Sequence, residues 1–112
     1  PTGCDPTPYA LLLEEPVPGV AGVLNEFALT GASASTRSWL LSGTAVGITP
    51  VKGCPGLTVP LTDLHRQDER FPDAFGATTF AFGVPAALSG DRYYVVLQPI
   101  ACTVSNVVIH TW

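Results

Sequence analysis

The sequence predicts an all-β fold: a two-sheet antiparallel β-sandwich of about seven to eight strands, immunoglobulin-like or jelly-roll-like in topology. Short apolar runs alternate with turn signals at a spacing of roughly 8–12 residues, which is typical of such sandwiches. Eleven glycines and eleven prolines in 112 residues, with no methionine, argue against long helices. The length fits one domain, residues 1–112, with an N-terminal arm over residues 1–8.

Five apolar runs in the first half of the chain end at glycine, proline or polar residues and are expected to be strands: 9–14, 22–30, 37–46, 48–52 and 57–61. The second run alternates and places Val23, Phe27 and Leu29 on one face. Prolines at positions 50, 55 and 60 confine the last two runs to sheet edges, because proline cannot donate to a strand ladder.

Residues 62–75 form one hydrophilic island, which we expect to be a surface loop with room for one helical turn. It contains four carboxylates that invite comparison with a calcium site: Asp63, Asp68, Glu69 and Asp73. Their spacing matches no calcium loop, and arginines lie among them. A solvated, internally paired loop is therefore the favoured interpretation.

The last third of the chain carries the strongest strand signal. Residues 77–84 place Thr78, Phe80, Phe82 and Val84 on one face. The runs 92–98 and 103–111 are expected to close the sandwich as a hairpin.

Charge is scarce, since Asp, Glu, Lys and Arg make up 12% of residues while hydrophobic residues make up 46%. A domain this poor in charge has a Ser/Thr/Gly surface or hides part of its surface against other molecules. The five basic residues are scattered and the net charge is −4, which argues against a nucleic-acid partner. Every apolar run is shorter than the ~20 residues of a membrane span, so none is expected.

No catalytic or metal-binding signature is present in the sequence. Cys4, Cys54 and Cys102 belong to no CxxC pair or Cys/His cluster, so zinc is not expected and no cofactor is predicted. His65 and His110 fall in different elements, and the G-x-S-x-G nucleophile elbow is absent. We therefore expect no enzyme activity.

Aromatic residues suggest a binding surface. In one interpretation four aromatics form a flat platform for sugar rings: Trp39, Tyr93, Tyr94 and Trp112. Trp39, Tyr94 or Trp112 then stacks on the sugar, while Asp63 or Asp73 supplies hydrogen bonds. Surface glycans are the partners that this interpretation implies.

The competing interpretation is structural. Trp39 and Tyr93 then fill the core, whereas Tyr94 and Trp112 lie outside. Trp112 would anchor a contact with a neighbouring subunit, because tryptophan is common at the centre of interfaces.

A series of motifs occurs in a characteristic order: Gly3-Cys4, Pro18 to Gly22, Trp39 to Gly43, Gly53-Cys54, Phe82 to Pro85, Leu88 to Gly90, Leu97-Gln98 and Ser105-Asn106. In this order the chain resembles a small β-sandwich module of secreted proteins from environmental bacteria. The resemblance spans nearly the whole chain and implies an exported β-sandwich without a known enzyme activity.

The resemblance also implies a disulfide. The two Gly-Cys sites are its natural pair, which corresponds to Cys4 and Cys54 in this sequence. Cys102 departs from the pattern, so that a Cys54–Cys102 bond is the alternative. With the first pairing, Cys102 is a free thiol or links subunits.

These observations predict an extracellular or cell-surface structural subunit that self-assembles into a filament or surface layer. A single lysine leaves the sheet edges with little charge against edge-to-edge pairing, and the N-terminal arm offers strand addition to the next subunit. Six residues are the expected subunit interface: Tyr9, Leu11, Leu13, Val108, His110 and Trp112. The alternative function is a carbohydrate-binding or adhesive β-sandwich module.

Overall fold

The computed structural model describes residues 11–112 and contains, within that range, only strands and their connections. The prediction of an all-β fold is confirmed. The ten strands are β1 (Leu12–Leu13), β2 (Leu24–Thr30), β3 (Ser38–Gly43), β4 (Ala45–Pro50), β5 (Thr58–Thr62), β6 (His65–Arg70), β7 (Thr78–Gly83), β8 (Asp91–Gln98), β9 (Thr103–Val104) and β10 (Val108–Thr111).

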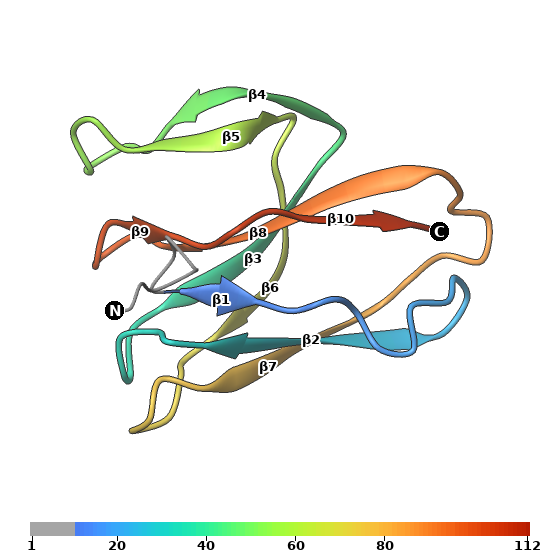
Figure 1. The fold of residues 1–112 in the computed structure, drawn as a ribbon, viewed down its shortest axis with the longest axis horizontal. Coiled ribbons are helices and arrows are strands. Elements are labelled where there is room, and N and C mark those ends of the chain that lie inside the picture. Colours follow the sequence, from blue (N-terminus) through green and yellow to red (C-terminus); the bar gives the residue numbers. More distant parts are fainter. Residues whose placement is uncertain (1–10) are drawn as a thin grey trace, which may run out of the picture.

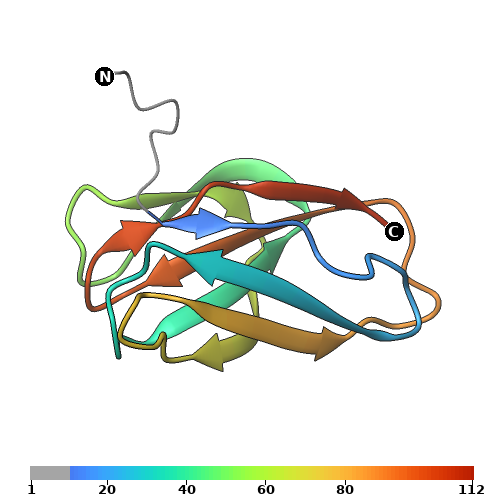
Figure 2. The same cartoon turned by 60° about the horizontal axis from the view of Figure 1, so that its bottom comes forward.

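The strands form three antiparallel layers (Figure 1). A three-stranded sheet has the order β1-β2-β7, and a central sheet has the order β10-β8-β3-β6 with β9 also paired to β8. These two sheets form a β-sandwich whose strand order is immunoglobulin-like. Figure 2 shows the three-stranded sheet in front of the central one. Strands β4 and β5 pair only with each other, and this β4–β5 ribbon lies on the other side of the central sheet.

Each face of the central sheet has its own hydrophobic core. Toward the three-stranded sheet, Leu40 and Tyr94 pack with Phe27 and Phe80. Toward the ribbon, a second group of buried residues comes from β3, β5 and β8: Leu41, Val59, Leu61, Val95 and Leu97. Strand β8 is therefore buried on both faces, which explains why its sequence is a continuous apolar run rather than a clean alternation.

The expectation that residues 62–75 form a loop is wrong, because β6 lies within them. Its residues pair antiparallel with β3, with Trp39 opposite Glu69 and Leu41 opposite Arg66. Strand β6 is an edge strand with mostly exposed side chains. Charged side chains on both faces are typical of protected edges, and they remove the apolar alternation by which a strand is recognised in the sequence.

A carboxylate bridges the two sheets on the β6 side. Asp68 Oδ2 of β6 accepts hydrogen bonds from the backbone N–H of Ala81 in β7 at 2.9 Å and from Arg70 Nε at 2.8 Å. Asp68 Oδ1 accepts from the backbone N–H of Glu69. The bridge satisfies an edge donor of β7 that would otherwise lack a strand partner.

A side-chain amide bridges the opposite side of the sandwich. Asn106 lies between β9 and β10, and its Oδ1 accepts from the backbone N–H of Leu13 at 2.8 Å. Its Nδ2 donates to the Leu13 carbonyl oxygen at 3.0 Å. The amide thereby pairs with edge strand β1 as a backbone group of a neighbouring strand would.

The Asp68 bridge makes stability depend on pH. Partial burial alone would raise the pKa of Asp68, but hydrogen bonds from Ala81, Arg70 and Glu69 outweigh this effect and lower the pKa below its ordinary value of 3.8. A carboxylate with a lowered folded-state pKa stabilises the fold above its unfolded-state pKa, and this contribution is lost as pH falls through the folded-state pKa. We expect Asp68→Asn to lose about 1–3 kcal/mol at neutral pH and to show a shallower loss of stability below about pH 4.

Urea unfolding measured between neutral pH and pH 2.5 tests this expectation. Asp63→Asn is the matched control, because Asp63 is exposed and accepts one 3.3 Å hydrogen bond from Thr44. Equal pH profiles for the two variants would contradict the role given to Asp68.

Candidate functional site

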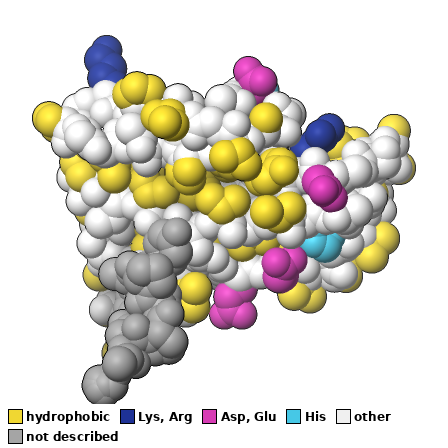
Figure 3. Space-filling view, turned by 45° about the horizontal axis from the view of Figure 1, so that its top comes forward, with side chains coloured by type: hydrophobic (Ala, Val, Ile, Leu, Met, Phe, Trp, Pro, Cys, Tyr) yellow, Lys and Arg dark blue, Asp and Glu magenta, His cyan; other side chains and the backbone are white. Residues whose placement is uncertain are grey.

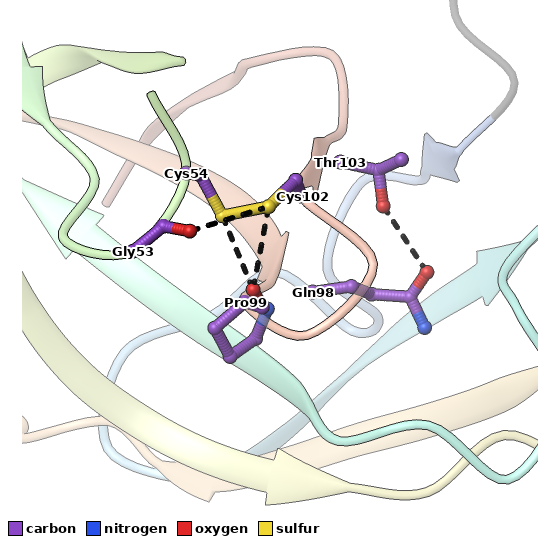
Figure 4. The surroundings of a disulfide bond; sticks show 6 residues. All are labelled: Gly53, Cys54, Gln98, Pro99, Cys102 and Thr103. Carbon is purple, nitrogen blue, oxygen red and sulfur yellow. Dashed lines mark hydrogen bonds between the residues drawn. A yellow bond between two sulfur atoms is a disulfide. The ribbon is translucent and has the colours of Figure 1, made fainter. Parts of the chain in front are cut away.

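The disulfide joins Cys54 and Cys102, so the predicted Cys4–Cys54 pair is wrong and the alternative pairing is the one observed. Cys54 lies in the turn between β4 and β5, and Cys102 lies in the turn between β8 and β9 (Figure 4). Packing of the ribbon on the central sheet brings these turns together, with the Cα atoms 5.5 Å apart. The sequence pattern does not show that the ribbon packs on the central sheet, so the proximity of these two turns could not be predicted. Cys102 is therefore not the free or intersubunit thiol that the first pairing implied, and Cys4 lies outside the described residues.

Three residues expected at a subunit interface belong to the domain's own core. Leu11, Leu13 and Val108 have exposed fractions of 2%, 2% and 4%, and they pack in the core between the two sheets. They are therefore corrected from interface to core residues. Tyr9 lies outside the described residues.

The C-terminal strand is held by its own chain. The His110 ring lies with Nε2 3.0 Å from the Gly19 carbonyl oxygen, and Trp112 Nε1 donates to the Tyr94 hydroxyl at 2.8 Å. Backbone hydrogen bonds also join Trp112 with Gly90 in both directions. The domain itself therefore holds this strand, and His110 and Trp112, which we expected at a subunit interface, are half-buried within it.

The predicted aromatic platform is not formed. Tyr94 is buried, and its ring meets that of Trp112 edge-on at 88°. Trp39 is paired with Leu97 and packs against the ribbon core, on the other face of the central sheet from Tyr94. The competing interpretation was also wrong in detail, because Tyr94 is the core residue and Tyr93 is only half-buried.

The carboxylates proposed for sugar contacts serve local turns. Asp63 accepts from the Thr44 hydroxyl, and Asp73 Oδ1 accepts from the backbone N–H groups of Phe75 and Ala77 at 2.8 and 3.0 Å. Among residues 11–112, no three His, Cys, Asp or Glu side chains gather into a metal-binding group. No helix in the same range is long and apolar enough to cross a membrane.

An apolar cleft of about 400 Å³, here called the ribbon cleft, lies between the β4–β5 ribbon and the central sheet. Trp39, Leu64 and Val51 line it together with buried Val59 and Leu97. The indole of Trp39 is fixed, because its Nε1 donates to Glu69 Oε2 at 2.6 Å and the Arg66 guanidinium lies 5.2 Å from its ring centroid.

The outer surface beside the ribbon is apolar. Figure 3 shows a band of hydrophobic side chains on this face, with charged groups mostly at its margins. Strand β4 contributes to the apolar surface of the molecule through Val46 and Ile48, which are 71% and 75% exposed. Apolar surface of this kind is typical of a contact with another molecule when it is continuous.

Phe75 is an exposed aromatic on an ordered turn. It is 92% exposed, and the Asp73 carboxylate holds the backbone of the turn on either side of it. Phe75 was not predicted from the sequence, although Asp73 and Gly76 occupy the first and last positions of a β-turn, which places Phe75 at a central position.

A second, polar cleft of about 410 Å³ lies at the β6–β7 side of the sandwich, near the end of β7. Residues of both sheets line it, among them Ser42, His65, Gln67, Phe82, Arg92 and Tyr94. Burial raises the pKa of the Tyr94 hydroxyl above 10.0, although the Trp112 hydrogen bond and the Arg92 charge oppose this, so the hydroxyl is protonated at neutral pH.

Comparison of the chain with family models, with curated proteins and with solved structures found no match. The resemblance to a secreted β-sandwich module therefore stays a prediction.

The observed disulfide predicts a large loss of stability on its removal. It closes a loop with a sequence separation of 48 residues, for which the loop-entropy estimate is about 4 kcal/mol. We expect Cys102→Ser to lower the free energy of unfolding by up to this amount, and Cys4→Ser to keep the wild-type value. Chemical denaturation measures the free energies, and peptide mapping without reductant identifies the bond. A Cys4–Cys54 peptide, or equal destabilisation by the two variants, would contradict the pairing.

Proposed function

We propose that this protein is an extracellular structural subunit that self-assembles head to tail into a filament or surface layer. The observation that carries the proposal is the pairing of an exposed aromatic, Phe75, with an apolar cleft elsewhere on the same molecule. Residues 73–76 form the turn that connects β6 to β7, whereas the ribbon cleft lies between β4–β5 and the central sheet. A knob and a hole on different surfaces make a heterologous contact, which propagates into an open chain unless a rotation closes it.

The ribbon cleft has the chemistry to receive an aromatic side chain. Its volume of about 400 Å³ lies in the range of pockets that bind small organic groups, and apolar side chains dominate its lining. Trp39 is already fixed by Glu69 and Arg66, so inserting a ring costs little side-chain entropy there. Phe75 on its fixed turn is similarly preorganised.

Strand addition is a weaker candidate for the contact between subunits. The Asn106 amide is already hydrogen-bonded to the backbone N–H and carbonyl of Leu13 on β1. The Asp68 carboxylate already accepts a hydrogen bond from the backbone N–H of Ala81 on β7. At either edge of the three-stranded sheet, an incoming strand would have to displace these hydrogen bonds. Residues 1–8, which we expected to act as a strand donor, lie outside the described residues, and their role stays a prediction.

The disulfide supports the proposed location. Structural disulfides form and persist mainly in oxidising compartments such as the cell exterior. The Cys54–Cys102 bond ties the ribbon turn to the β8–β9 turn, and Cys54 is buried. A subunit exposed outside the cell would keep the shape of the ribbon cleft through this bond.

The proposed contact predicts complementary defects. Phe75→Ser removes the knob and Val51→Asp places a charge in the hole, and either change is expected to weaken self-association by about 30-fold or more, as truncation of an interface anchor does. Leu24→Ser is the control, because it removes an apolar side chain that is 60% exposed on β2. Sedimentation velocity across a range of concentrations measures the assemblies.

Mixing the two defective variants is the sharper test. Phe75→Ser retains the hole and Val51→Asp retains the knob, so each pair of different molecules has one intact contact. We expect each variant alone to be monomeric and the equimolar mixture to give dimers but no longer chains. Assembly of either variant alone to the wild-type extent, or a wild-type protein that is monomeric at all concentrations, would contradict the proposal.

A further inference from the structure

The polar cleft combines charge, hydrogen-bonding groups and an aromatic wall in a way that self-assembly through Phe75 does not use. It lies where β6 and β7 face each other across the sandwich, and the β3–β4 and β7–β8 connections contribute Thr44, Pro85 and Leu88 to its rim. Its volume of about 410 Å³ exceeds what a small inorganic ion requires and falls in the usual range for an organic ligand.

The charge in the cleft is opposite to that of the whole chain. The net charge of the protein is −4, yet Arg92 and His65 line the cleft and its lining includes no Asp or Glu. Within residues 11–112 the ion pairs involve Arg37, Arg70 and His110, so the Arg92 guanidinium has no carboxylate partner there. A planar guanidinium with five donors matches a carboxylate in a bidentate geometry, which indicates an anionic group on the ligand.

Further hydrogen-bonding capacity lies on the wall formed by β3 and β6. Gln67 Nε2 donates to Ser42 Oγ at 2.7 Å. The Ser42 hydroxyl proton and the Gln67 carbonyl oxygen are then a donor and an acceptor side by side. Such a pair suits vicinal hydroxyl groups, each of which both donates and accepts.

The remaining wall is apolar. Phe82 is half-buried, with its ring 6.1 Å from that of Tyr94, and Pro85 and Leu88 lie beside it on the cleft lining. An aromatic ring together with aliphatic side chains suits the C–H face of a sugar ring. Protein carboxyl termini also carry a carboxylate, but they lack the paired hydroxyls for which Ser42 and Gln67 are arranged.

We infer that the polar cleft binds an acidic sugar unit of the uronate class, with Arg92 on the carboxylate, Ser42 and Gln67 on ring hydroxyls, and Phe82 against the ring. This site is separate from the knob and the hole of the proposed assembly. The sugar site is thereby placed in the polar cleft and not on the predicted aromatic platform. Tyr94 is the one residue that the platform and the lining of this cleft have in common.

Isothermal titration calorimetry with glucuronate and galacturonate, and with glucose and acetate as comparison ligands, tests the inference. The Phe75→Ser protein is used alongside the wild type, so that binding is measured independently of assembly. We expect a uronate to bind at least about tenfold more tightly than glucose or acetate, since charge-assisted hydrogen bonds and ring contacts act together. Equal affinity for acetate would overturn the sugar assignment in favour of a simple anion site, and tighter binding of a short peptide through its C-terminal carboxylate would overturn it in favour of a peptide site.

Variants locate the site. Arg92→Gln is expected to remove the preference for uronate over glucose, and Leu88→Trp to weaken both by filling the cleft. Arg37→Gln is the matched control, because it removes the same charge from the connection between β2 and β3, outside the lining of both clefts. Equal losses for Arg92→Gln and Arg37→Gln would overturn the site. If Arg92→Gln fails to fold, perturbation of the Gln67 side-chain amide signal by uronate in the wild-type protein decides the question, and an unchanged signal at saturating uronate overturns the inference.

Discussion

Burial of the central sheet on both faces is the constraint on which the rest of this structure depends. Tyr94 and Val96 of β8 face the three-stranded sheet, while Val95 and Leu97 face the β4–β5 ribbon. The buried part of β8, residues 94–98, cannot carry charged side chains, because their desolvation would be uncompensated. Charged residues make up only 12% of the sequence. The two buried faces of the central sheet account for part of this scarcity, independently of any contact with other molecules. Three layers in a chain of 112 residues also mean that each core is thin.

Thin cores explain the covalent and polar links between the layers. The Cys54–Cys102 bond fastens the ribbon to the central sheet, and Asp68 and Asn106 join the two sheets at opposite sides. Both clefts lie between layers. The ribbon cleft is lined by residues of the ribbon and the central sheet, and the polar cleft is lined by residues of both sheets of the sandwich. Both candidate sites thus follow from the layering rather than from any single motif.

The sequence predicted a strand well where at least one of its faces is buried, because burial leaves an apolar pattern in the sequence. The strands at 24–30, 78–83 and 91–98 were predicted from apolar runs. The prolines predicted edge positions for 48–52 and 57–61, and β4 and β5 pair only with each other, but the separate ribbon was not predicted. Strand β6 was missed because both of its faces are polar. The disulfide was mispaired because the expected pairing rested on the resemblance, and the sequence pattern does not show that the ribbon packs on the central sheet. The polar cleft was missed because Ser42, Gln67 and Arg92 come from three strands whose order the sequence pattern does not give. Phe75 was also missed, although Asp73 and Gly76 on either side of it are residues typical of a β-turn.

Native-state hydrogen exchange of the ladder amides in β4 and β5, compared with those in β8, tests the double burial most directly. If the ribbon is an integral third layer, its slowest amides exchange only through global unfolding and report the same opening free energy as the amides of β8. Exchange of the whole ribbon through local opening, at a free energy far below that of β8 and with β8 still protected, would show that the central sheet is stable without its second cover and would contradict the account.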